Sequence, residues 1–280
     1  MFTLQSYGLS QMRSSGILLA MKQLSKGPLS QFSPEFKKSL YVKIDQALAE
    51  GAAPIAAFDA DGTLWDADIG ENFFDYEIEN CNLETLKAVD DPWAFYNANK
   101  IPDPRVGYAW LAQINKGYSL SQVQTWAKQA VRSIHPVPVL ESMKELIEFL
   151  KSRSVEVFIV TASVKWAVEP AASLVGIDFD HVLGITTKVL DTQVTDEVEY
   201  PITWRDGKAE ALLKRTNNVR PLLAAGNTYG DIALIKTATH VNLAVSTQSE
   251  KNALYEEEIR LVNEAETNSW SHHQFRSLPR

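Results

Sequence analysis

Short apolar runs alternate with helical patterns along most of the chain. Four segments are largely apolar and lack polar alternation: 54–58, 155–160, 222–225 and 240–245. Such runs are typical of strands buried on both faces of a parallel sheet. Residues 139–150 and 166–175 carry apolar side chains at helical offsets, and residues 182–189, rich in Thr and Val, predict another strand. The repetition of strand, helix and strand predicts an α/β class, with a Rossmann-like, largely parallel sheet.

A helix is predicted before the first strand. Ser33 is a good N-cap and Pro34 suits the first helical position. Apolar residues then recur at every fourth position from Phe36 to Leu48, which gives one apolar stripe. Gly51 is placed to end the helix. The core domain is therefore expected to begin at residue 33.

The stretch between the first two predicted strands has a different character. It contains no convincing apolar strand, and eleven of the 27 aromatic residues lie between Trp65 and Trp126. We interpret residues 66–135 as a mainly helical insertion, with the Rossmann-like core made of residues 33–65 and 136–280. We interpret residues 1–32 as an N-terminal extension; a cleaved or targeting segment and a start codon assigned too early are the alternatives. Its longest apolar stretch, residues 16–21, is too short for a typical secretory leader.

Composition narrows the function classes. The 280 residues are 45% hydrophobic and 22% charged, which is ordinary for a globular protein and excludes general disorder. The net charge is −8 and no dense basic cluster exists, so we expect no nucleic-acid partner. No apolar run approaches membrane-spanning length. Cys81 is the only cysteine, so we expect a soluble, cytoplasmic protein whose metal, if any, is held by oxygen. The oligomeric state stays open.

Polar clusters follow three of the predicted strands. They are residues 59–63 (Asp-Ala-Asp-Gly-Thr), residues 161–163 (Thr-Ala-Ser) and residues 226–231 (Gly-Asn-Thr-Tyr-Gly-Asp). Lys208 lies at the start of a predicted helix between the last two clusters. Ligands of open parallel sheets bind at the carboxyl ends of the strands. We therefore expect these groups to meet at one edge of the sheet, although each alone would most simply be a turn or a helix cap.

The residue types in these clusters suit phosphoryl transfer. Asp59 and Asp61 are close in the sequence, and the repulsion between their carboxylates favours a bound cation. A site rich in oxygen suits Mg²⁺. Asp59 can act as a nucleophile, and Asp61 can act first as an acid and then as a base. The hydroxyl of Thr161 and the backbone N–H of Ala162 can donate to phosphoryl oxygens, and Lys208 supplies a positive charge.

These motifs, taken in order, resemble those of the haloacid dehalogenase superfamily of phosphohydrolases. Residues 58–64 (Phe-Asp-Ala-Asp-Gly-Thr-Leu) match its first motif and residues 160–163 (Val-Thr-Ala-Ser) its second. Lys208 matches the third, and residues 226–231 match the fourth. The resemblance covers residues 54–245. A helical cap between the first two motifs is similar to that of the phosphoserine phosphatase-like subgroup.

The resemblance implies roles for these residues. Asp59 would form an aspartyl-phosphate, Asp61 would be the general acid and base and a backbone ligand of Mg²⁺, and Asp231 would complete the acidic part of the metal site. The fourth motif commonly begins Gly-Asp, whereas Asn227 stands here. Its carbonyl oxygen can still hold metal or water, but it adds no charge. Dehalogenation fits poorly, because that reaction needs neither a metal nor a second carboxylate.

The resemblance implies that the substrate is a small phosphorylated metabolite and that the cap determines which one. In phosphoserine phosphatases an acid at about the position of Asp68 holds the amino group of the substrate, and Glu71 follows one helical turn later. Both are candidate substrate contacts for an amino-bearing phosphomonoester such as phosphoserine or phosphocholine; alternatively they are solvated capping acids. The cap aromatics could cage a quaternary ammonium or simply form a helical core. Two other functions stay open, a phosphotransferase acting on an acceptor hydroxyl and a non-catalytic phosphate-binding module.

Overall fold

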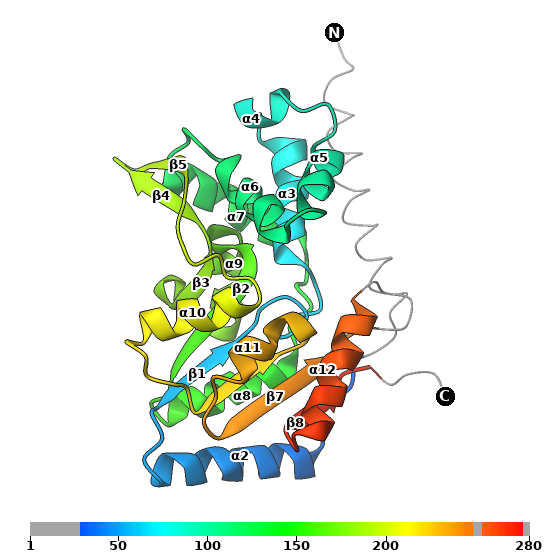
Figure 1. Cartoon of the computed structure of the whole chain (residues 1–280), viewed down its shortest axis with the longest axis vertical. Coiled ribbons are helices and arrows are strands. Elements are labelled where there is room, and N and C mark those ends of the chain that lie inside the picture. The colour runs from blue at the N-terminus through cyan, green and yellow to red at the C-terminus, as the bar shows by residue number, and fades with distance from the viewer. Residues whose placement is uncertain (1–28, 249–253, 277–280) are drawn as a thin grey trace.

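The computed structural model describes residues 29–248 and 254–276 (Figure 1). The predicted N-terminal extension therefore lies almost wholly outside the described residues. At the centre is a six-stranded sheet whose neighbouring strands are all parallel, in the order β3-β2-β1-β6-β7-β8. Its strands are β1 (Ile55–Phe58), β2 (Glu156–Val164), β3 (Val182–Ile185), β6 (Leu223–Gly226), β7 (Val241–Ser246) and β8 (Ser271–Gln274). The predicted parallel α/β fold is confirmed.

Helices cover both faces of this sheet. Ala56 and Phe58 of β1 pack in one core with α2 (Pro34–Ala49) and α8 (Glu141–Ser152). Ala57 points to the opposite face and packs toward α10 (Asp206–Arg215) and α11 (Ile232–Ile235). Because successive side chains of a strand alternate between faces, a sheet covered on both sides requires uninterrupted apolar runs. This arrangement explains the lack of polar alternation in the strands.

Helix α2 begins and ends where the sequence predicts. The hydroxyl of Ser33 accepts a hydrogen bond from the Phe36 amide at 3.1 Å. Leu40 and Ile44 of the apolar stripe are fully buried against the core. Glu50 is the C-cap residue, and Gly51 follows with a φ of +89°, which a glycine adopts without strain.

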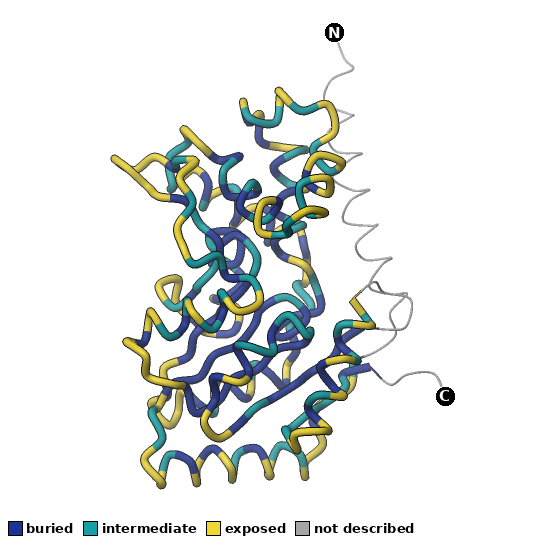
Figure 2. The backbone as a smooth tube through the Cα atoms, in the orientation of Figure 1, coloured by how far each residue is buried: buried dark blue, intermediate teal, exposed yellow. Residues whose placement is uncertain are grey.

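The insertion between β1 and β2 is helical, as expected. It contains α3 (Ile69–Asn80), α4 (Glu84–Lys87), α5 (Pro92–Lys100), α6 (Pro104–Gln113) and α7 (Leu120–Ser133). Figure 1 shows these helices stacked over one end of the sheet. Phe73, Phe74 and Tyr96 are buried in a core of their own, which continues into Val164, the last residue of β2, and Trp166. Figure 2 shows largely buried central strands, whereas the helices of the insertion above them mix buried, intermediate and exposed residues.

The segment predicted as one strand over residues 182–189 forms two. β3 stays in the parallel sheet, whereas β4 (Thr187–Leu190) leaves it and pairs antiparallel with β5 (Gln193–Val198). This hairpin packs against the helical insertion, where the Gly117 amide donates to the Val194 carbonyl at 2.8 Å. The carboxyl-terminal strand β8 was not predicted, because its sequence Ser-His-His-Gln carries no apolar pattern.

Two connecting elements complete the description. Helix α9 (Lys165–Ala172) follows β2 and is continued by the 3-10 turn η1 (Ser173–Val175), in place of the single helix predicted over residues 166–175. Helix α12 (Tyr255–Thr267) lies between β7 and β8 in the chain and packs on β7. None of the helices described here is long and apolar enough to cross a membrane.

Candidate active site

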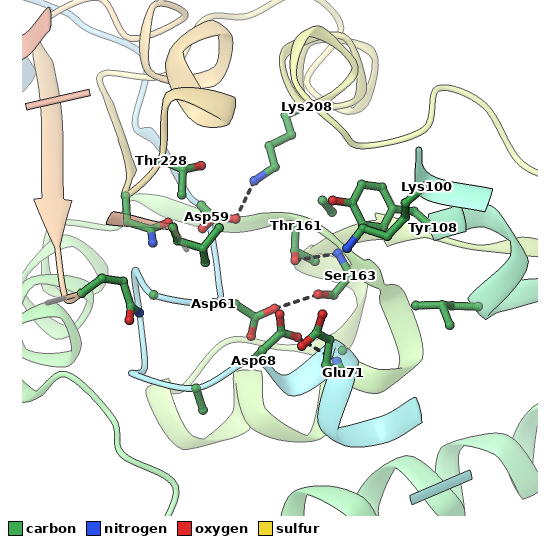
Figure 3. Close-up of a pocket in the computed structure, with 18 of the residues that line it drawn as sticks. Asp59, Asp61, Asp68, Glu71, Lys100, Tyr108, Thr161, Ser163, Lys208 and Thr228 are labelled. Carbon is green, nitrogen blue, oxygen red and sulfur yellow. Dashed lines mark hydrogen bonds and ion pairs between the residues drawn. The ribbon is translucent and has the colours of Figure 1, made fainter. Parts of the chain in front are cut away.

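The carboxyl ends of the central strands line a cavity of about 510 Å³ that the helical insertion covers (Figure 3). Asp59 directly follows β1, Thr161 lies near the end of β2, and Asn227 directly follows β6. The insertion contributes Asp68 and Glu71, which lie beside Asp61 (Figure 3). The parallel sheet thus brings together motifs that lie far apart in the sequence, as predicted.

Lys208 links two of the predicted site carboxylates. Its Nζ donates to Asp59 Oδ1 at 2.6 Å and to Asp231 Oδ1 at 2.5 Å, and all three side chains are buried. Burial alone would lower the pKa of Lys208, but the charges of Asp231 and Asp59 raise it above the ordinary lysine value. Lys208 is therefore a permanent positive charge at the base of the cavity.

Asp59 has an environment suited to a nucleophile that needs a cation. Burial raises its pKa to about 7, the negative charge of Asp231 adds to the rise, and Lys208 opposes it. Asp59 Oδ2 lies 3.1 Å from the hydroxyl of Thr63, and the same hydroxyl lies 3.3 Å from Asn227 Oδ1. Asp59 shares the single charge of Lys208 with Asp231, so a second cation near Asp59 would favour its ionised form.

Asp61 is held in one orientation by three donors. Its Oδ1 accepts from Trp65 Nε1 at 2.7 Å and from the Ile69 amide at 2.9 Å, and its Oδ2 accepts from the Ser163 hydroxyl at 2.7 Å. Burial and the charge of Asp68 raise the pKa of Asp61 to about 7, and these three hydrogen bonds oppose the rise. A carboxyl group with a pKa near neutrality can both give and take a proton at physiological pH.

The second motif presents hydroxyl and amide groups to the cavity. Thr161, Ala162 and Ser163 all line it. The Thr161 hydroxyl oxygen accepts from the Ser163 amide at 3.0 Å, which leaves its hydrogen available to a ligand. The backbone of Thr161 is fixed in turn by the buried hydroxyl of Thr203, which donates to its carbonyl at 2.6 Å.

The fourth motif places an amide where the family pattern has a carboxylate. Asn227 Nδ2 donates to Glu258 Oε1 at 2.9 Å, so that its Oδ1 faces the side of Asp59 and Thr63. Glu258 is fully buried; burial raises its pKa to about 7, and hydrogen bonds from Gln248, Asn227 and Thr247 oppose the rise. Sequence reasoning missed Glu258, which lies on α12, 31 residues beyond Asn227.

The oxygen donors fit a hard divalent cation such as Mg²⁺. Asp59 Oδ2 and Asn227 Oδ1 converge on one hydroxyl, and oxygen is the donor that Mg²⁺ prefers. Asp231 is engaged differently from the prediction. Its Oδ1 binds Lys208, and its Oδ2 accepts from the Asn227 and Thr228 amides and the Thr228 hydroxyl. A role for Asp231 as a metal ligand therefore stays a prediction. What the structure shows is its ion pair with Lys208.

The cap wall carries acidic and aromatic groups. Asp68 is the N-cap of α3 and accepts from the Glu71 amide at 2.7 Å, while remaining accessible from the cavity. The surrounding protein and the charge of Glu71 raise the pKa of Asp68 to about 7. Tyr96 and Tyr108 line the same part of the cavity, and Lys100 Nζ lies 4.6 and 5.3 Å from the centres of their rings. This wall therefore already holds one ammonium group.

Other charged and aromatic side chains of the insertion and its first residues lie away from the cavity. Asp66 is buried and paired with Arg276, away from the cavity. Arg105 is exposed and pairs with Asp103 at 2.8 Å. Most of the cap aromatics pack on each other; Phe74, for example, contacts Trp93 and Trp110 edge to face. The interpretation of the aromatics as a helical core thus holds for most of them, and only Tyr96 and Tyr108 face the cavity.

The structure shows site contacts that the sequence did not predict, made by Ser163, Trp65 and Lys100. Ser163 and Trp65 donate hydrogen bonds to the carboxylate of Asp61. Their positions in the sequence could have indicated this, because Ser163 lies within the second motif and Trp65 directly follows the first. Lys100 lines the cavity, and its ammonium lies against the ring of Tyr96.

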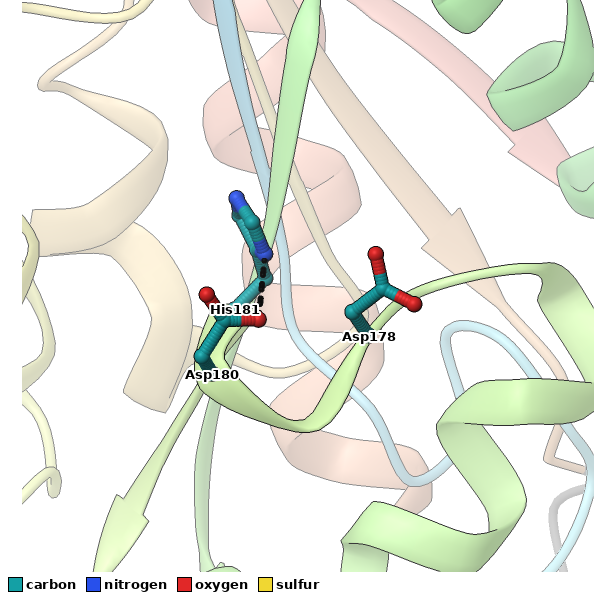
Figure 4. A group of neighbouring side chains, drawn as sticks. All are labelled: Asp178, Asp180 and His181. Carbon is teal, nitrogen blue, oxygen red and sulfur yellow. Dashed lines mark hydrogen bonds and ion pairs between the residues drawn. The ribbon is translucent and has the colours of Figure 1, made fainter.

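A second group of metal-ligand type lies outside the cavity. Asp178, Asp180 and His181 cluster just before β3, at the amino end of the sheet (Figure 4). The two ring nitrogens of His181 are each 3.0 Å from a carboxylate oxygen, one of Asp180 and one of Glu156. These contacts account for the histidine, and the exposed aspartates need no ion to be stable.

Together, the parallel sheet and the groups at its carboxyl edge define a Rossmann-like hydrolase with a helical cap. A model of the haloacid dehalogenase-like hydrolase family matches residues 56–236, more than half of the chain. The chain belongs to this family, which confirms the resemblance found in the sequence.

Individual relatives are more distant. Phosphorylcholine phosphatase of Pseudomonas aeruginosa is 22% identical over an aligned length of 273. The alignment covers 75% of this chain and 77% of that protein. A solved structure of a protein of unknown function from Bordetella pertussis Tohama I has a TM-score of 0.63 at 15% identity and covers 80% of this chain and 100% of its own. A conserved protein of unknown function from Anaerococcus prevotii has a TM-score of 0.63 at 16% identity, covering 88% of this chain and 93% of its own. These two likenesses support the fold.

Proposed function

We propose that this protein is a Mg²⁺-dependent phosphatase that hydrolyses a small phosphomonoester carrying an amino or ammonium group. The observation that carries the proposal is one cavity lined by two chemically distinct sets of side chains. Asp59, Asp61, Thr161 and Lys208 come from the motifs, and Asp68, Glu71 and the two tyrosines come from the helical insertion. A cavity of about 510 Å³ suits a small metabolite.

In the first step the Asp59 carboxylate attacks phosphorus and the ester oxygen leaves. Asp61 gives its proton to that oxygen, so the alcohol departs neutral and an aspartyl-phosphate remains on Asp59. In the second step Asp61 takes a proton from water, whose oxygen attacks phosphorus and releases phosphate and free Asp59. The fixed orientation of Asp61 and its pKa of about 7 support both roles.

The remaining groups neutralise and orient the phosphoryl oxygens. Lys208, Thr161 and Ala162 line the cavity, and Lys208 Nζ lies beside the Asp59 carboxylate. Asp59, Asn227 and the backbone of Asp61 would hold Mg²⁺, with Asp231 beside them. When bound, Mg²⁺ offsets the repulsion between the Asp59 carboxylate and the phosphate dianion.

The cap wall supports the choice of substrate. Two acids and two tyrosine faces stabilise a cation, and the ammonium of Lys100 already lies against both rings. The name of the Pseudomonas aeruginosa relative is consistent with an ammonium-bearing substrate. We also propose that residues 66–135 act as the substrate-selecting cap, together with the β4–β5 hairpin that packs on it.

A substrate panel tests this proposal. Phosphocholine, phosphoethanolamine and phosphoserine are compared with glycerol phosphate and a hexose phosphate, with Mg²⁺ and with excess chelator, in the native chain and in Asp59→Asn. We expect Mg²⁺-dependent phosphate release, highest for an ammonium-bearing ester and absent in Asp59→Asn. A preference for the sugar phosphate would overturn the substrate class, and activity unaffected by chelation would overturn the metal. Transfer of phosphate to an added alcohol instead of water would identify a phosphotransferase.

A further inference from the structure

The side-chain amide of Asn227 has a fixed orientation. Its Nδ2 donates to Glu258 Oε1 at 2.9 Å, and Thr63 Oγ1 lies 3.3 Å from its Oδ1. Rotating the amide by half a turn would set its carbonyl oxygen against Glu258 Oε1, and the ionised carboxylate has no proton to donate to it. The neighbouring loop also confines the amide, because a Cβ atom on Gly62 would lie 2.1 Å from Nδ2.

Glu258 is built into the fold as a carboxylate acceptor. One of its oxygens accepts from the amides of Thr247 and Gln248, at 3.1 and 2.9 Å. It lies in the first turn and a half of the thirteen-residue helix α12, where the helix dipole favours a negative charge. The side chain is completely buried, so its charge acts on its neighbours without screening by solvent.

We propose that Glu258 is a positioning residue for the metal site. It turns the Asn227 carbonyl oxygen toward Asp59. It also supplies, behind Asn227, the negative charge that a motif beginning Gly-Asp would place at position 227 itself. This inference rests on the proposed function, because it concerns the Mg²⁺ that this function uses. The total charge around the cation is then kept, while the charge is moved from the ligand to the group that holds the ligand.

The inference predicts that positions 227 and 258 are energetically coupled. Removing the charge with Glu258→Gln should weaken Mg²⁺ binding by about tenfold or more, since a charged hydrogen-bond partner contributes about 1.5–3 kcal/mol. In that background Asn227→Asp returns a carboxylate to the site, and the new amide at 258 can donate to it. The double variant should therefore bind Mg²⁺ within about threefold of the native chain. A threefold change corresponds to about 0.7 kcal/mol, because each tenfold change corresponds to about 1.4 kcal/mol.

The experiment is a double-mutant cycle read out by metal binding. Mg²⁺ affinity of the whole chain is measured by calorimetry, and Mn²⁺ affinity by electron paramagnetic resonance, for the native protein, both single variants and the double variant. Glu264→Gln is the matched control, because Glu264 lies on the same helix but pairs with Lys236 on the surface. It should leave both affinities unchanged.

The outcomes separate this inference from the proposed function. If the native chain binds neither ion, the metal in the proposed function is wrong. If it binds them and Asn227→Asp changes the affinity equally in both backgrounds, the inference about Glu258 is wrong. If Glu258→Gln alone does not fold but the double variant folds and binds metal, the coupling is confirmed. If neither folds, Glu258→Asp replaces Glu258→Gln, because it keeps the charge but withdraws it from Asn227, and the same criterion of unequal effects applies.

Discussion

The hydroxyl of Ser163 donates to Asp61 Oδ2 at 2.7 Å, and this contact joins the second motif to the acid of the first. It links two strands that are neighbours in the sheet but whose motifs lie about a hundred residues apart in the chain. The bond orients the carboxylate and also lowers its pKa against the rise caused by burial. Both effects can be measured.

Ser163→Ala should lower kcat about tenfold and raise the pKa of Asp61, because the hydrogen bond favours the ionised carboxylate. The limb of the kcat/KM profile that reports loss of the proton from Asp61 should then move to higher pH. An aryl phosphate is the substrate for this measurement. Ser152→Ala on the surface of α8 is the control, and an unmoved limb in Ser163→Ala would contradict the role of the contact.

Asp59→Asn and Asp61→Asn should fail at different steps. The amide in Asp59→Asn cannot attack phosphorus, so neither product nor phosphoenzyme should form. Asp61→Asn keeps the nucleophile and loses the proton donor and acceptor, which lowers turnover by roughly 10²- to 10⁴-fold. Mass spectrometry of quenched reactions should detect phosphoenzyme in Asp61→Asn and none in Asp59→Asn. Phosphoenzyme in Asp59→Asn would place the nucleophile elsewhere.

The stability of the metal-free protein should fall as pH rises from about 4 to about 7. Burial raises the pKa of Asp61 to about 7, whereas an unfolded aspartate has a pKa of about 3.9. In this window the folded chain holds a proton that the unfolded chain has lost, so raising the pH favours unfolding. Thermal unfolding in chelator should show the slope, and Asp61→Asn should reduce it. An equal slope in both proteins would show that Asp61 does not titrate in this way.

Lys100→Met should improve the binding of ammonium-bearing substrates. The ammonium of Lys100 lies 4.6 Å from the centre of the Tyr96 ring and competes with a substrate cation for the same faces. Its removal should lower KM for phosphocholine by roughly threefold to tenfold, the range of a partly buried cation–π contact, and leave kcat for an aryl phosphate unchanged. Lys116→Met, which breaks only the surface pair with Asp196, is the control. A higher KM would mean that Lys100 contacts the substrate's anionic part.

The sequence by itself determined the parallel sheet, the helical insertion and the identity of the groups at the sheet edge. These features are local: apolar runs of strand length reveal burial on both faces, and Asp59, Thr161 and Asn227 each directly follow or end such a run. The edge at which they meet then follows from the parallel topology.

Only the tertiary structure decided which side chains complete the site. Glu258 reaches Asn227 because α12 packs beside the fourth motif, and Lys100 reaches the cavity because α5 lies against α6. The departure of the hairpin β4–β5 from the sheet likewise depends on the cap surface that receives it. Contacts of this kind depend on how distant helices pack, and a pattern of residues along the chain records which face of a helix is buried but not which partner buries it.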